Sequence, residues 1–105
     1  MTYNTRARAD ISVADLSGSK LYTGTASSSS WVGSDPYTQV VSVTGLTVED
    51  KTILELDLSQ TIYADVAAEE LAFSLIYRAV PGTDQITLYA TGTPAVSFDI
   101  NVVVI

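Results

Sequence analysis

The chain has 105 residues, of which 47% are hydrophobic, so we expect one globular domain with a modest core rather than a disordered polypeptide. Its formal net charge of −7 argues against nucleic acid and anionic membranes as partners, because both are bound through clustered Lys and Arg. The absence of His and Cys excludes disulfides, thiol nucleophiles and zinc sites of the Cys/His kind.

Residues 1–35 differ in composition from the rest of the chain. Thr, Ser, Ala and Gly dominate, and residues 27–30 are four consecutive serines. Two short alternating segments, 9–13 and 20–23, are typical of strands but carry too little apolar surface to hold themselves in place. Two interpretations stay open: an arm that becomes ordered against a partner subunit or a larger assembly, and a pair of edge strands on the same domain.

Two segments with strand periodicity follow, joined by a hairpin-sized connection over residues 44–50. Residues 37–43 are rich in β-branched and aromatic side chains and alternate, with Tyr37 on the same face as two valines. Residues 51–58 place three leucines on one face and Glu55 and Asp57 on the other. A sheet with one polar, solvent-exposed face and one apolar face is typically antiparallel.

The apolar period becomes helical after Asp65, which is the expected N-cap. Apolar residues then recur on one helical face as far as Ala79, and the Pro-Gly pair at 81–82 is expected to end the helix. Phe73 and Tyr77 lie four residues apart and off this stripe. They would form a second burial face if a neighbouring subunit packs on the helix.

Two further strands complete the pattern, over residues 85–91 and 94–105. A single helix can cover the apolar face of a four-stranded sheet. The sequence therefore predicts an α+β fold, a mainly antiparallel β-sheet with one helix packed on a face in ββαββ order. We expect this head domain over residues 36–105, preceded by an extended N-terminal arm over residues 1–35 that anchors the protein or contacts other subunits.

No residue pattern points to catalysis, metal binding or a cofactor. Glu69 and Glu70 are adjacent on the expected helix, so their side chains diverge and cannot act as a general acid and base pair. Glu49 and Asp50 lie outside any calcium-loop pattern. No His is present to activate a hydroxyl nucleophile. We therefore predict a protein that is not an enzyme and has no catalytic, metal or cofactor-binding residues.

Aromatic side chains are the remaining candidates for function. Exposed Trp and Tyr side chains either anchor a subunit interface or stack on sugar rings, and a place in the core is the ordinary alternative. We favour core or interface anchoring over a sugar platform. The candidate interface or glycan contacts are Trp31, Tyr22, Tyr37, Phe73, Tyr77 and Tyr89.

The segment over residues 31–47, WVGSDPYTQVVSVTGLT, resembles one that recurs in virion proteins of tailed bacteriophages. That pattern is a Trp, a short Gly/Pro turn, Pro-Tyr-Thr-Gln, alternating Val, and a Gly before a short hairpin. The resemblance extends to the segments 76–79 and 86–90, and to the Thr-Pro pair at 93–94 before the terminal strand.

The resemblance implies a non-enzymatic structural protein of the virion. This protein would be a short appendage, a tail or baseplate component, or a capsid decoration protein. Family members are terminal modules of fibres, baseplates or head appendages and are usually symmetric oligomers. We expect a homo-oligomer, with a trimer favoured, that docks on other virion proteins through its arm. Because no signal peptide is visible, we expect synthesis in the host cytoplasm and a final location in the virion. The alternative is a carbohydrate- or receptor-binding module that attaches to a host surface glycan.

Overall fold

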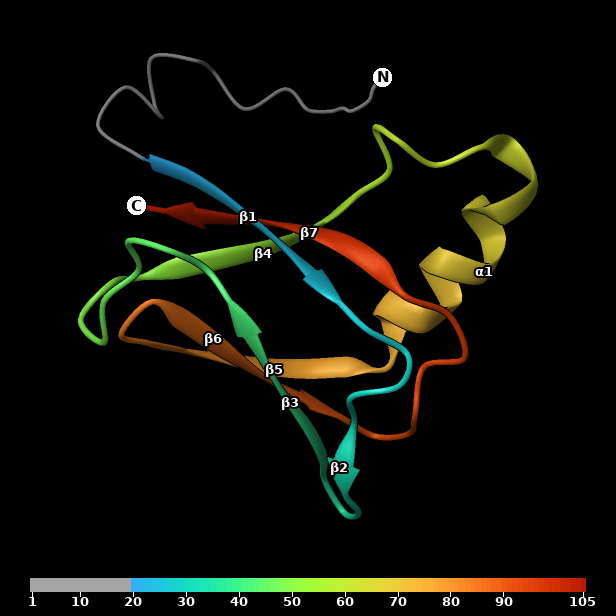
Figure 1. Cartoon of the computed structure of the whole chain (residues 1–105), viewed down its shortest axis with the longest axis horizontal. Coiled ribbons are helices and arrows are strands. Elements are labelled where there is room, and N and C mark those ends of the chain that lie inside the picture. Colours follow the sequence, from blue (N-terminus) through green and yellow to red (C-terminus); the bar gives the residue numbers. More distant parts are fainter. Residues whose placement is uncertain (1–19) are drawn as a thin grey trace.

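The computed structural model describes residues 20–105, which form seven strands and one helix (Figure 1). The fold is mainly antiparallel β-sheet with one helix, as the sequence predicts at this level. In chain order the elements are β1 (Lys20–Ala26), β2 (Val32–Gly33), β3 (Tyr37–Ser42), β4 (Thr52–Asp57), α1 (Tyr63–Ser74), β5 (Ile76–Gly82), β6 (Gln85–Ala90) and β7 (Phe98–Val104).

The strands form two sheets that pack face to face. One sheet has the order β1-β7-β4 and the other has the order β2-β3-β6-β5, and every neighbouring pair is antiparallel. Alternation turns one side of each strand inward, so Ile86 and Leu88 of β6 meet Ile100 and Val102 of β7 in a single core. All four of these side chains are fully buried.

The ββαββ arrangement in one sheet is wrong for the described chain. Residues 36–105 contain β3, β4, α1, β5, β6 and β7 and supply strands to both sheets. The connection over residues 44–50 is not a hairpin, because β3 pairs with β6 whereas β4 pairs with β7. Helix α1 lies at one end of the two sheets rather than on a face (Figure 1). The two sheets bury each other's apolar faces instead.

The helix is shorter than its apolar pattern suggests. It begins at Tyr63 with Ile62 as N-cap, so Asp65 lies in the first turn instead of capping it. It ends at Ser74, and the residues expected in its last turn belong to β5. A β-bulge between Ile76 and Arg78 explains the error. The extra residue lets Ile76 and Ala79 share the inward face of a strand at a spacing of three, which is also a helical spacing.

Residues 20–33, expected to belong to an arm, contribute strands in the described chain. β1 pairs with β7 along its whole length, from Lys20 opposite Val104 to Ala26 opposite Phe98. The edge-strand interpretation therefore holds for residues 20–26. The boundary expected between residues 35 and 36 falls in the turn between β2 and β3. The segment 9–13 and the rest of residues 1–19 lie outside the described residues, and the anchoring role of the arm stays a prediction.

One buried polar side chain holds the connection that leads from β1 in the first sheet to the second sheet. Gln39 of β3 is 4% exposed, and its Oε1 accepts a hydrogen bond from the Ser27 backbone N–H at 2.8 Å. Its Nε2 donates to the Ser27 carbonyl oxygen at 2.9 Å. Since a buried amide is costly when unpaired, this reciprocal pair specifies where the chain leaves β1.

Candidate functional site

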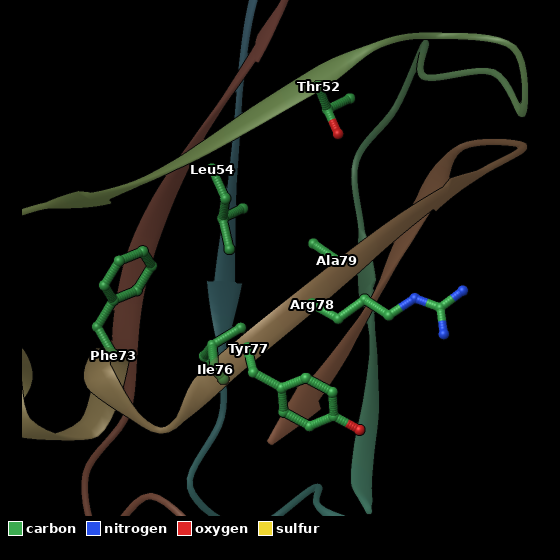
Figure 2. A pocket seen from close by; sticks show the side chains of 7 residues that line it. All are labelled: Thr52, Leu54, Phe73, Ile76, Tyr77, Arg78 and Ala79. Carbon is green, nitrogen blue, oxygen red and sulfur yellow. The ribbon is translucent and has the colours of Figure 1, made fainter. Parts of the chain in front are cut away.

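An open groove, lined by both apolar and polar atoms, lies between the free edges of the two sheets. β4 is the last strand of one sheet and β5 is the last strand of the other, and no strand of the described chain pairs with their outer sides. Figure 2 shows the side chains that line this groove. They come from β4, β5 and the end of α1, and they are Thr52, Leu54, Phe73, Ile76, Tyr77, Arg78 and Ala79.

The floor of the groove is the margin of the core. Leu54, Phe73 and Ile76 are half-buried and pack against the buried cluster. Phe73 meets Phe98 edge to face, with ring centroids 6.0 Å apart and planes at 88°. Phe73 therefore packs on the core of its own chain and also borders the groove, and its role as an interface contact stays a prediction. The groove contains apolar surface that the chain itself does not cover, and it holds no paired titratable groups for catalysis.

Tyr77 and Arg78 border the groove, but their side chains extend to the outer side of β5, where they form a cluster with Tyr89. The register places Arg78 opposite Tyr89 of β6, with the guanidinium carbon 5.1 Å from the centre of the Tyr89 ring. Tyr77, at the bulge, lies 6.4 Å from the same ring and is 57% exposed. In Figure 2 the Tyr77 and Arg78 side chains point away from β4. This Tyr77–Arg78–Tyr89 cluster presents aromatic faces and one cation to solvent.

The other three predicted aromatic contacts lie elsewhere. Tyr22 and Trp31 are half-buried and pack against the core. The Trp31 Nε1 is buried and has no hydrogen-bond partner among the described residues. Tyr37 lies on the face of β3 that carries the buried Gln39 and Val41. The structure therefore brings two of the six predicted residues together, Tyr77 and Tyr89, and Tyr77 lies on a strand instead of a helix.

Sequence reasoning missed Arg78 and the groove. Arg78 falls in the segment that was predicted to be helical as far as Ala79, and only the strand pairing at the bulge places it opposite Tyr89. Leu54 was expected to be a core residue, and it is half-buried at an open edge. The alternation of apolar and polar residues was the only sequence signal for Arg78 and for the groove. This alternation does not show which strands lie at the edge of a sheet.

The outer face of the β1-β7-β4 sheet carries a polar row and an apolar row. Asp57 and Asp99 lie directly opposite each other, and the Thr25 hydroxyl donates to Asp99 Oδ1 at 2.8 Å. Within residues 20–105, no group of three or more acidic side chains is arranged to hold a metal ion. Four residues further along each strand, Leu21, Val103 and Ile53 form a row of apolar side chains across the three strands.

The comparisons with known proteins identify no relative. No protein-family model matches the chain, no curated protein matches it, and no solved structure matches it. The one helix of the described part of the chain, α1, is not long and apolar enough to cross a membrane.

Proposed function

We propose that the protein is a non-enzymatic structural protein that acts through homo-oligomeric assembly. The observation that carries the proposal is the open groove between the free edges of β4 and β5, whose floor is an uncovered apolar margin of the core. Free strand edges and uncovered core margins favour association with another chain, and proteins that stay monomeric usually protect them. Covering this groove in an assembly would add stability that a chain of this size gains only modestly from its own core.

Exposed apolar side chains on both sheets support the same proposal. Leu21 and Ile53 lie on the outer face of one sheet, and Val32 and Val40 lie on that of the other. The net charge of −7 would keep free copies soluble until a specific contact forms.

The resemblance of residues 31–47 to phage virion proteins supplies the finer parts of the proposal. The first part is a location in the virion, where the protein would be a short appendage, a tail or baseplate component, or a capsid decoration protein. The second part is a trimeric state. Docking on other virion proteins through an N-terminal arm belongs to the same set.

The test is the molar mass of the purified full-length chain. Size-exclusion chromatography with light scattering, followed by sedimentation equilibrium over a concentration series, should show a defined oligomer. A monomer at high micromolar concentration would contradict assembly as the function.

A carbohydrate-binding module is the second candidate, and the Tyr77–Arg78–Tyr89 cluster favours it. Sugar rings stack on exposed aromatic faces, and the guanidinium would pair with the carboxylate of an acidic sugar. Trp31, Tyr22 and Tyr37 were also expected to stack on sugars, but Trp31 and Tyr22 pack against the core and Tyr37 lies on the inward face of β3.

A glycan array probed with the full-length chain tests this second candidate. We expect Tyr89→Ala and Arg78→Gln to remove binding, and Tyr63→Ala to leave it unchanged. Tyr63 is the matched control because it is 93% exposed and lies on α1, outside the cluster. An array without hits would eliminate the candidate.

A further inference from the structure

β4 is a regular free strand edge of the described chain. The other edge of its sheet, β1, contains Gly24 and packs against β3. The other edge strand beside the groove, β5, carries a bulge and Pro81, and both features discourage pairing with another strand. β2 has only two residues. β4 runs for six residues without Pro, Gly or a bulge, and no charged side chain points inward from it between Thr52 and Leu56. It therefore offers a regular template for a further strand.

The backbone of β4 shows which groups are available. The Ile105 N–H donates to the Lys51 carbonyl oxygen at 3.0 Å, so Lys51 directs its backbone toward β7. In an antiparallel pair, successive residues direct their N–H and C=O groups alternately toward the partner and away from it. Thr52 and Leu54 consequently direct theirs toward the open edge.

The outward side chains of β4 form a self-complementary row. Lys51, Ile53 and Glu55 are exposed and alternate along the strand, with the apolar side chain midway between a positive and a negative charge. A second β4 laid antiparallel about a two-fold axis at Ile53 would place Ile53 against itself. Lys51 of each copy would then lie opposite Glu55 of the other.

We propose that β4 pairs antiparallel with β4 of a second copy of this chain, in the register that places Ile53 opposite Ile53. Thr52 and Leu54 of the two copies then exchange N–H···O=C hydrogen bonds, and the two three-stranded sheets become continuous. This contact deepens the proposed assembly function and rests on it, because it names the partner that covers the groove. It gives a two-fold dimer in place of the trimer that the resemblance implies.

The packing of the side chains favours this register over registers that are shifted along the strand. Ile53 already extends the apolar row of Leu21 and Val103, and pairing continues that row into the second copy. A shift by two residues toward Asp57 would replace the Lys51–Glu55 pairs with Lys51–Asp57 pairs but would put Ile53 opposite Glu55, and a shift the other way would put Ile53 opposite Lys51. Either shift loses the contact between the two Ile53 side chains, which makes it the poorer cross-strand combination. The two grooves would face each other across the axis, with Leu54 beside the second copy's Thr52.

Charge reversal tests the register in the full-length chain. Lys51→Glu places two negative charges opposite each other at both symmetric positions, and Glu55→Lys places two positive ones there. Each should raise the dissociation constant of the dimer about tenfold, as measured by sedimentation equilibrium. The double variant should restore wild-type affinity, and an equimolar mixture of the two single variants should form a heterodimer.

A backbone variant tests the strand pairing itself. Thr52→Pro removes the N–H that points to the open edge and leaves the bonds to β7 in place, so it should give a folded monomer. Thr52→Val keeps that N–H and should remain a dimer. If Thr52→Pro fails to fold by circular dichroism, the charge variants still decide the proposal.

The possible results of these experiments distinguish the β4–β4 contact from the proposed assembly function. A two-fold contact of this kind closes as a dimer, so a wild-type dimer that responds to the charge variants as described supports it. A trimer or other oligomer that is insensitive to these variants would overturn the contact and leave the assembly function standing. A monomer at all concentrations would overturn both. A monomer whose Thr52 and Leu54 amides resist hydrogen exchange would also overturn both, and would indicate that residues 1–19 occupy the edge.

Discussion

Gly24 of β1 lies where the two sheets approach each other most tightly on the side away from the groove. A Cβ atom at this position would lie 2.8 Å from Val41 Cγ1 and 3.3 Å from the Ser42 carbonyl oxygen of β3. The absence of a side chain at Gly24 therefore lets β1 rest against β3. One side of the sandwich is closed by this contact, whereas the opposite side, between β4 and β5, is open.

We expect Gly24→Ala to lower the free energy of unfolding by about 1–3 kcal/mol, because the new methyl group must displace a buried valine and strand backbone. Urea unfolding followed by circular dichroism measures the change. Gly92→Ala is the matched control, since its Cβ atom would meet only Leu75 methyl carbons at 4.0 Å. An unchanged midpoint for Gly24→Ala would show that the close contact does not limit the packing of β1 on β3.

At the scale of the elements, α1 makes few contacts with the rest of the fold. Phe73 packs on Phe98, and the Thr61 hydroxyl donates a hydrogen bond to Glu69 Oε1 at 2.9 Å. The only buried residue of α1 is Ala72, and its N-cap residue Ile62 makes no side-chain hydrogen bond to the first turn. Leu71, which the apolar pattern places on the buried face, is 68% exposed. The helix therefore contributes less to the core than the strands do, and its N-terminus can be improved.

We expect Ile62→Ser to raise the free energy of unfolding by about 1 kcal/mol, because the hydroxyl can accept a hydrogen bond from a free N–H of the first turn. The Ile62 side chain is 66% exposed, so its removal forfeits little burial. Ile62→Ala separates the two effects, since it removes the same apolar side chain without adding a cap. Thermal unfolding of the three proteins should rank Ile62→Ser as the most stable, and equal midpoints for the Ser and Ala variants would contradict the capping argument.

At the scale of the whole molecule, both sheets depend on one core. Ile100 of β7 is fully buried and belongs to the same cluster as Ile86 of β6, so neither sheet has a core of its own. Unfolding should accordingly be a single cooperative transition.

We expect Ile100→Ala to cost about 2–5 kcal/mol through the cavity that it leaves. The single tryptophan, Trp31, adjoins the other sheet. Its fluorescence should therefore shift to the same new midpoint as far-ultraviolet circular dichroism, although the substitution is in β7. Leu71→Ala, on the exposed side of α1, should change stability by no more than about 0.5 kcal/mol. Two separate transitions would show that the sheets fold independently.

The strands of this protein could be predicted from sequence because alternation is a local property. The inward positions of β6 and β7, such as Leu88 and Ile100, follow from side chains two residues apart. The end of the helix could not be predicted, because the bulge at Tyr77 gives a strand the apolar spacing of a helix. For the candidate site, Tyr77 and Tyr89 were predicted as contact residues from the sequence. Their position beside Arg78 could not be predicted, because it depends on the same bulge.

The sequence by itself determined that the chain folds mainly as antiparallel strands with one helix and which side of most strands faces inward. Only the tertiary structure decided that these strands divide between two sheets, that β7 pairs with both β1 and β4, and that β4 and β5 are left as free edges. The physical reason is that the side-chain pattern of a strand fixes its buried face, whereas its hydrogen-bonding edges are nearly identical in every strand. The choice of neighbours therefore depends on how the whole core packs.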